Sequence, residues 1–334
     1  MPAACSRCHN DGAGSLSYDL LSEELQKRWR VLAVFPDTFE ETAAAAVWNL
    51  EVGKAQDTLG ELIAASMLEW NESVRRYRLH DLARLFAGSR LGIEERADGL
   101  RLHATHYQTV LKAADDLYLK GGDAIRDGLM VFDLERRNIE AGQAWAEAKV
   151  GEDDQAAQLC IAYAYVGAYV LNLHQHPRER IRWLEVAVDA SRRLGQPGRE
   201  GDALGNLGLA YADLGETRRA IEFYEQQLII VREIGDRHGE GNALGNLGVA
   251  YTDLGETRRA IEFYEQRLVI AREIGDRRGE GTALWNMNLS LDKLGERAQA
   301  ITCAEQALTI FEQIEDPNAA QVRAQLAEWR SAQD

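Results

Sequence analysis

Few residues in this 334-residue sequence have the types and spacing that chemistry needs. Cys5, Cys8 and His9 form a C-x-x-C-H sequence, the pattern of covalent haem attachment, but no second axial ligand or second Cys pair accompanies it. His103 and His106 are three residues apart, which could place two imidazoles on one helix face, yet no third ligand is evident. We interpret the first set as a chance match and the second as a surface pair, and expect no metal and no cofactor.

A third candidate is the pair His80 and Asp81 in "YRLHDLARLF", which follows a short polar hairpin and leads into an apolar helix. A phosphate contact by His80 would need a glycine-rich loop and a magnesium site. The sequence has no G-x-x-x-x-G-K-[ST] motif, and its only Gly-Lys pair, Gly53-Lys54, has no glycine five residues earlier. The structural alternative is a helix start, where His80 caps the helix and Asp81 favours its positive end.

No histidine has the spacing to a Ser or Cys nucleophile that a catalytic constellation requires, so we expect that the protein is not an enzyme. The chain has 38 Lys and Arg against 54 Asp and Glu, a net charge of −16. This charge disfavours nucleic acid and acidic lipid as partners. The longest uncharged run, residues 155–177, has an apolar stretch too short to cross a bilayer. We expect a soluble, cytoplasmic protein.

The elements that would position a site are dominated by a repeat. Residues 201–240 and 241–280 are identical at 33 of 40 positions, residues 281–320 repeat them more loosely, and residues 161–200 keep the skeleton. Each unit predicts a helical hairpin. The first helix runs from about Ala203 to Leu214 and ends at Gly215, and Thr217 caps the second helix, which Gly235 closes. One hairpin cannot bury both faces, so the units must stack.

The unit resembles the tetratricopeptide repeat. It has the large apolar residue, Leu, Gly, Tyr, Ala and aromatic residue of the family pattern at the family's offsets, and "ALGNLG" is most similar to the Leu-Gly-Asn and kinesin-light-chain types. The pattern is carried by Leu204, Leu207, Gly208, Tyr211, Ala220 and Tyr224, then by Leu244, Leu247, Gly248, Tyr251, Ala260 and Tyr264. The unit departs from the family in its 40-residue length and in Gln227 and Arg267, where the family prefers Ala. The resemblance implies an all-α, right-handed solenoid.

The front third predicts three helices, at Ser22–Val34, Glu40–Asn49 (with Thr38 and Glu41 as a capping box) and Ala55–Ser66, then a β-hairpin over residues 67–79. This order is that of a small winged-helix domain. With "RYRLHDLARLFA" and "VFDLERRNIEAGQAWA", the region resembles bacterial STAND signalling NTPases of the NB-ARC kind. In that family the His of the His-Asp motif contacts ADP, so the resemblance makes His80 and Asp81 a vestigial nucleotide sensor.

Winged helices also bind DNA, which leaves a rival function open. The third helix, which would enter the major groove, carries Lys54 but also Asp57 and Glu61. Only the wing is basic, with Arg75, Arg76 and Arg78. Because affinity for DNA depends mostly on neutralising phosphates, we expect no nucleic-acid partner.

By the tetratricopeptide offsets, the first helix of each hairpin lines a concave groove. In that groove Asn206, Asn246 and Asn286 form a ladder of amides that can pair with an extended peptide backbone. Gly205 and Gly245 should leave room beside the ladder, and Trp285 could be an anchor. The alternative is that the amides only bond neighbouring helices. The full set of expected groove residues is Asp202, Asn206, Leu209, Asp213, Asn242, Asn246, Val249, Asp253, Trp285, Asn286 and Leu289.

These features predict four parts: a flexible N-terminus (1–15), a winged-helix domain (16–90), a helical linker or degenerate repeat (91–155) and tetratricopeptide repeats (156–334). The predicted function is that of a scaffold or sensor module of a STAND-type signalling protein, which binds a partner protein or peptide, with basic residues, in the groove. The alternatives are a DNA-binding transcriptional regulator and the non-catalytic part of a split NTPase switch.

Overall fold

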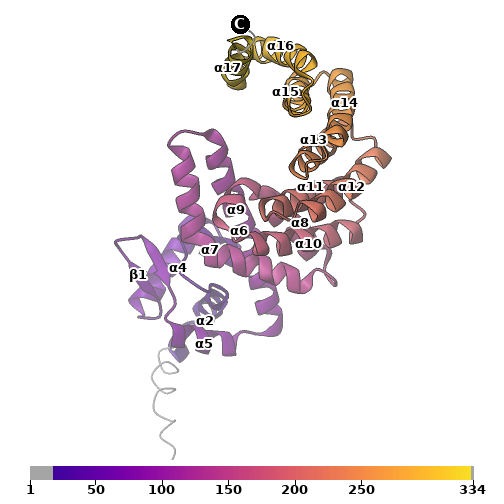
Figure 1. Cartoon of the computed structure of the whole chain (residues 1–334). Coiled ribbons are helices and arrows are strands. Elements are labelled where there is room, and N and C mark those ends of the chain that lie inside the picture. Colours follow the sequence, from indigo (N-terminus) through magenta and orange to yellow (C-terminus); the bar gives the residue numbers. More distant parts are fainter. Residues whose placement is uncertain (1–17, 332–334) are drawn as a thin grey trace, which may run out of the picture. The chain divides into compact units, whose positions relative to one another are not determined.

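The structure, a computed structural model, describes residues 18–331, and within that range it is all-α apart from one two-stranded hairpin (Figure 1). The chain divides into two compact units, Met1–His174 and Gln175–Asp334. The predicted four-part division is finer than this and stays a prediction. The first unit contains α2 (Glu23–Val31), η1 (Leu32–Val34), α3 (Glu41–Trp48), α4 (Val52–Ala64), β1 (Glu69–Asn71), β2 (Arg76–Arg78), α5 (Asp81–Arg90), α6 (Ile93–Lys120), α7 (Ala124–Lys149), α8 (Asp154–Val166) and α9 (Ala168–His174). The second contains α10 (Pro177–Arg193), α11 (Pro197–Asp213), α12 (Thr217–Glu233), α13 (Arg237–Asp253), α14 (Thr257–Ile274), α15 (Arg277–Lys293), α16 (Arg297–Gln313) and α17 (Asn318–Ser331).

The front of the first unit has the predicted order of three helices and a hairpin. Ser22 caps α2 by accepting a hydrogen bond from the backbone N–H of Leu25 (3.3 Å). Trp29 of α2 is buried and donates its indole N–H to the carbonyl of Met67 (2.8 Å), so it fastens the helix to the start of the hairpin. The hairpin is antiparallel with Trp70 opposite Tyr77.

The predicted capping box at Thr38 is wrong. Helix α3 begins at Glu41 with Glu40 as its N-cap, and no side chain caps it. Thr38 lies one step outside the helix because Phe39 pairs with Tyr77 in an isolated bridge beside the hairpin. Its hydroxyl instead accepts a hydrogen bond from Nε of Arg76 (2.8 Å). The tertiary contact therefore displaces the local cap.

Arg76 is also the centre of a buried polar cluster that fixes β2 to α7. Its guanidinium donates to both carboxylate oxygens of Glu135, at 2.6 and 2.8 Å, and to the carbonyl of Thr38 at 2.8 Å. Asn138 donates to the same carbonyl (2.9 Å) and to Glu135 (3.0 Å). Only 1% of Arg76 is exposed, so the charge survives burial because these partners satisfy it.

His103 is not part of a surface pair, as the sequence predicts, but a core residue of α6 with 1% of its surface exposed. Its ring packs against Phe35 and Tyr107, with ring centroids at 5.3 and 4.6 Å. Burial lowers the pKa of His103 to about 3, so the imidazole is neutral at physiological pH. His106, three residues on, is only partly exposed. The apolar surroundings explain the burial, since a neutral imidazole is a tolerable core side chain.

The second unit repeats one hairpin three times: α11 with α12, α13 with α14, and α15 with α16, preceded by α10 and followed by α17 (Figure 1). A glycine in the left-handed region follows every helix of the series at intervals of 20 residues, from Gly195 to Gly295, with φ between +62° and +79°. Behind each one the chain closes a bond six residues back, such as Glu216 N–H to the carbonyl of Tyr211 (2.9 Å). This end geometry needs glycine, and it confirms Gly215 and Gly235 as predicted caps.

Three details of the predicted hairpin are wrong. Helix α11 starts at Pro197, six residues before Ala203, because proline suits the first turn of a helix. Thr217 is the first residue of α12 rather than its cap, since the two-residue turn puts Glu216 in the N-cap position. Leu214, which the sequence places on the buried face, is 37% exposed because the helix has already ended there.

The interfaces between hairpins combine apolar packing with buried carboxylates. Ala220, Ile221, Tyr224, Leu228 and Val231 of α12 are all buried, as predicted. In addition, Glu240 at the start of α13 is buried and accepts from Arg232 of α12 (2.7 Å) and from Arg237. Glu280 at the start of α15 repeats this with Arg272 (2.8 Å) and Arg277 (2.5 Å). Each carboxylate thus ties the second helix of one hairpin to the first helix of the next.

Candidate functional site

The expected groove residues lie at equivalent positions on α11, α13 and α15, which we call together the inner face. These first helices contact one another directly and lie on the inner side of the curve of this unit (Figure 1). At spacings of four, three and four, Asn242, Asn246, Val249 and Asp253 follow one side of α13. The exposed members of the face are Asp202, Leu209, Asp213, Asn242, Val249 and Asp253, and the partly exposed ones are Asn206, Asn246, Trp285, Asn286 and Leu289.

The ladder amides are free. Asn206, Asn246 and Asn286 make no side-chain hydrogen bond to any other residue in the part of the chain that the structure describes. An amide that only joined neighbouring helices would be paired. Each therefore offers one donor group and one acceptor on the inner face.

Gly205 and Gly245 do not leave room beside the ladder, which corrects the prediction. A Cβ on Gly205 would lie 2.6 Å from the amide nitrogen of Gln227, and a Cβ on Gly245 would lie 2.9 Å from Cζ of Arg267. Gln227 and Arg267 come from the second helices α12 and α14. The space above each glycine is therefore filled by the long side chain that stands where the tetratricopeptide pattern has Ala.

The third hairpin makes the opposite choice at the same two positions. Trp285 of α15 takes the place of Gly245, and Ala307 of α16, which is buried, takes the place of Arg267. A large residue on one helix thus goes with a small one on the other. Sequence reasoning from one helix at a time missed Gln227 and Arg267 as inner-face residues, and this exchange was the signal that could have found them.

Charge on the inner face is acidic but partly compensated. Asp213 lies 3.6 Å from the guanidinium of Arg180, and Asp202 lies 3.5 Å from that of Arg199. Burial raises the pKa of Asp202, against the attraction of Arg199. Lys293, at the far end, is exposed. A basic side chain of a ligand would find carboxylates here, of which Asp253 forms no ion pair among the described residues.

His80 acts as a helix cap in the structure. It is the N-cap of α5, and its Nδ1 accepts a hydrogen bond from the backbone N–H of Leu82 (3.3 Å). Asp81 lies in the first turn and pairs with Arg84 (3.3 Å) and Arg78 (3.6 Å). The structural alternative for this pair is therefore sufficient to explain both residues.

The wing offers less positive charge than the sequence indicates. Arg76 is buried against Glu135, and Arg78 lies beside Asp81, so Arg75 is left as the uncompensated wing cation among the described residues. On α4, Lys54, Asp57 and Glu61 are all exposed. The net result is a surface with little capacity to neutralise phosphates.

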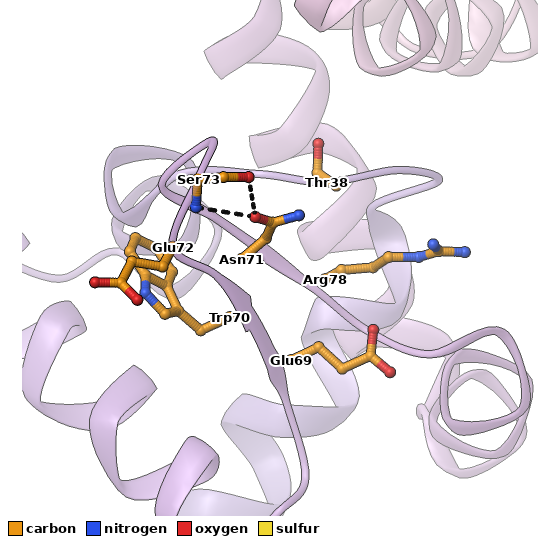
Figure 2. A pocket seen from close by; sticks show the side chains of 7 residues that line it. All are labelled: Thr38, Glu69, Trp70, Asn71, Glu72, Ser73 and Arg78. Atoms are coloured by element: carbon orange, nitrogen blue, oxygen red, sulfur yellow. Dashed lines mark hydrogen bonds between the residues drawn. The ribbon is translucent and has the colours of Figure 1, made fainter.

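A depression of about 760 Å³ lies beside the hairpin (Figure 2). Its lining residues are Thr38, Glu69, Trp70, Asn71, Glu72, Ser73 and Arg78. The hydroxyl of Ser73 is bound to Asn71 Oδ1 (2.7 Å), as Figure 2 shows, and no histidine lines the depression to activate it. It therefore lacks the constellation that nucleophilic catalysis needs.

No group of three or more metal-ligating side chains occurs among residues 18–331. In the same range, no helix has the length and apolar character needed to cross a membrane. Cys5, Cys8 and His9 lie outside the described residues.

Comparison with known proteins follows the repeat. The family described as tetratricopeptide repeat matches residues 199–273, which cover α11 to α14. The repeat unit is of the tetratricopeptide type. No curated protein sequence matches the chain.

Three solved structures are similar in architecture. A STAND protein with a tetratricopeptide repeat sensor from Pyrococcus horikoshii is 14% identical over 93% of this chain and 64% of its own, with a TM-score of 0.40. Repeats assigned to a kinesin light chain of Podospora anserina are 16% identical over 64% of this chain and 98% of their own (0.49). Aspartyl phosphate phosphatase F of Bacillus subtilis is 13% identical over 99% and 96% (0.37). The chain thus spans 64% of the STAND protein's length. With TM-scores below 0.5, these likenesses say nothing about its function.

Proposed function

We propose that the inner face binds an extended segment of a partner protein, and that the chain is a non-catalytic scaffold or sensor module. The observation that carries the proposal is the ladder of Asn206, Asn246 and Asn286, whose amides are partly exposed and unpaired. A polar group that has no partner in the free protein gains a hydrogen bond, without breaking an internal one, when a peptide backbone reaches it.

The spacing of the ladder supports an extended ligand. The three amides stand at the same position of successive stacked hairpins, so they offer a row of equivalent donors and acceptors. An extended backbone presents its own donors and acceptors in a regular row as well. The carboxylates of Asp202, Asp213 and Asp253 favour a segment that also carries Lys or Arg.

The setting that we propose is a STAND-type signalling protein. It rests on the winged-helix order of α2 to β2, on His80 and Asp81 at the start of α5, and on the repeats that follow. In this chain His80 is a helix cap, and a nucleotide site would have to come from elsewhere. The proposed role is therefore recognition, with the repeats as the receiving surface.

Site-specific photo-crosslinking tests the surface. A benzophenone amino acid is placed at Asn246 on the inner face, and in a matched variant at Glu262, which is exposed on α14. After irradiation in the source cell, the Asn246 variant is expected to capture a discrete partner through one short segment, and the Glu262 variant is not. Capture through Glu262 alone would contradict the proposal.

A further inference from the structure

The inner face carries two polar groups that its own helix does not supply. On α13, Gly245 lies three residues after Asn242 and four before Val249, so it belongs to the same side of the helix. The side chain of Arg267 crosses over it from α14, with Cζ 2.9 Å and Cδ 3.1 Å from where a Cβ would be. The guanidinium thus occupies the place of an inner-face side chain, next to Asn246 in the ladder.

Arg267 has no partner within the protein. It forms no hydrogen bond and no ion pair with another residue of the range 18–331. The acidic group that influences it most is Asp276, whose Oδ1 already accepts the backbone N–H of Gly279 (2.8 Å) as the cap of α15. Burial lowers the pKa of Arg267, which shows that attraction to Asp276 does not repay the lost hydration.

Gln227 repeats the situation one hairpin earlier. It crosses over Gly205 in the same way, is 6% exposed, and its Oε1 has no hydrogen-bond partner among the described residues. Adjacent hairpins that differ at only seven of forty positions thus place an unpaired acceptor and an unpaired cation at one equivalent site. Buried polar groups are normally paired, so an unpaired pair in register points to a ligand.

We propose that Arg267 forms a subsite for a carboxylate side chain of the bound segment, with Gln227 receiving a donor group from the part of the segment one hairpin away. The planar fork of a guanidinium matches the two oxygens of a carboxylate, which ammonium or amide groups do not. The partner segment is then of mixed charge: an Asp or Glu at Arg267, with basic residues toward Asp202, Asp213 and Asp253. This inference rests on the proposed function and specifies its ligand.

The test uses the whole chain and a phage-displayed library of random dodecapeptides. Peptides that bind the wild type and are lost on Asn246→Ala should share an Asp or Glu at one position. Replacing that residue by Gln or Asn in a synthetic peptide should weaken binding to the wild type about tenfold or more. The same replacement should change little on Arg267→Gln, a variant that has the residue of the preceding hairpin and should therefore keep the fold. Arg267→Lys keeps the charge without the fork and should give an intermediate loss.

The outcomes separate the two proposals. Peptides that depend on Asn246 but share no acidic position, or bind Arg267→Gln as tightly as the wild type, overturn the subsite and leave the inner face as a binding surface. If no peptide is selected, or if Asn246→Ala has no effect on those that are, both proposals are overturned.

Discussion

At the scale of single residues, the chemistry of the first unit is structural. Arg76 and Glu135 form a bidentate pair with 1% and 6% of their surfaces exposed. His103 is neutral in an aromatic pocket. Both were visible in the sequence as candidates for binding, and both are used to hold the hairpin and α6 in place. Exposure decides the matter, and exposure depends on contacts between elements far apart in the chain.

Removing one member of the buried pair should be costly. Glu135→Gln leaves the guanidinium of Arg76 buried without a counter-charge, and we expect the free energy of unfolding to fall by about 3–5 kcal/mol. Glu40 also contacts Arg76 (3.3 Å) but is half exposed, so Glu40→Gln is the matched control, with an expected loss below about 1 kcal/mol. Urea unfolding of both variants measures this. Equal losses would show that the charge of Glu135 is not needed.

His103 should make stability depend on pH. The folded protein holds its pKa at about 3, below the ordinary value of 6.5, so the unfolded chain binds a proton that the folded chain does not. The contribution is fully present above about pH 6.5 and is lost as the pH falls toward 3, by up to about 1.4 kcal/mol per pH unit. The stability of His103→Leu, compared with the wild type by urea unfolding at pH 7, 6 and 5, should fall less steeply. Parallel curves would mean that His103 does not titrate on unfolding.

At the scale of elements, the hairpins are built by exchange of volume between two helices. A Cβ on Gly248 of α13 would lie 2.7 Å from the ring of Tyr264 on α14, whereas the third hairpin has Asn288 opposite Ala304. The tetratricopeptide pattern was recognisable from the sequence because these positions recur every 40 residues. Which long side chain lies over which glycine was not, because that depends on how the helices of one hairpin are rotated against each other.

Breaking and restoring this exchange tests the packing. Tyr264→Ala should cost about 3–5 kcal/mol through the cavity that it leaves. Gly248→Asn should cost about 1–3 kcal/mol or more by overpacking. The double variant reproduces the pair of the third hairpin, so its cost should be clearly smaller than the sum of the two single costs, measured by chemical unfolding. Strict additivity would show that the two side chains do not share one space.

The helix ends offer a stabilising change. The series of left-handed glycines ends at Glu315, which holds φ at +54° where every earlier helix end has glycine. Glu315→Gly relieves this strain, and we expect a gain of about 0.5–1 kcal/mol in the free energy of unfolding. Gly295→Ala imposes the same strain at the preceding end and should lose a similar amount. A loss of stability in Glu315→Gly would mean that the side chain contributes more than the backbone costs.

At the scale of the whole molecule, the sequence predicted the all-α fold and the stacked hairpins because both follow from periodicity. It also placed the Asn ladder at equivalent positions of α11, α13 and α15. It could not show that Arg267 and Gln227 reach the inner face, since their helix periodicity assigns them to α14 and α12. Nor could it show that Arg76 is buried, because Glu135 is 59 residues away.

The central claim is that the ladder on the inner face binds a partner segment, and one affinity comparison tests it most directly. The partner captured by the crosslink is measured by calorimetry against the wild type, Asn246→Ala and Glu262→Ala. Asn246→Ala should retain its thermal stability, because the amide is unpaired in the free protein, and should bind more weakly by about 1–3 kcal/mol, since a ligand group loses its partner. Glu262→Ala should bind like the wild type. Wild-type affinity in Asn246→Ala, or a loss confined to Glu262→Ala, would contradict the account.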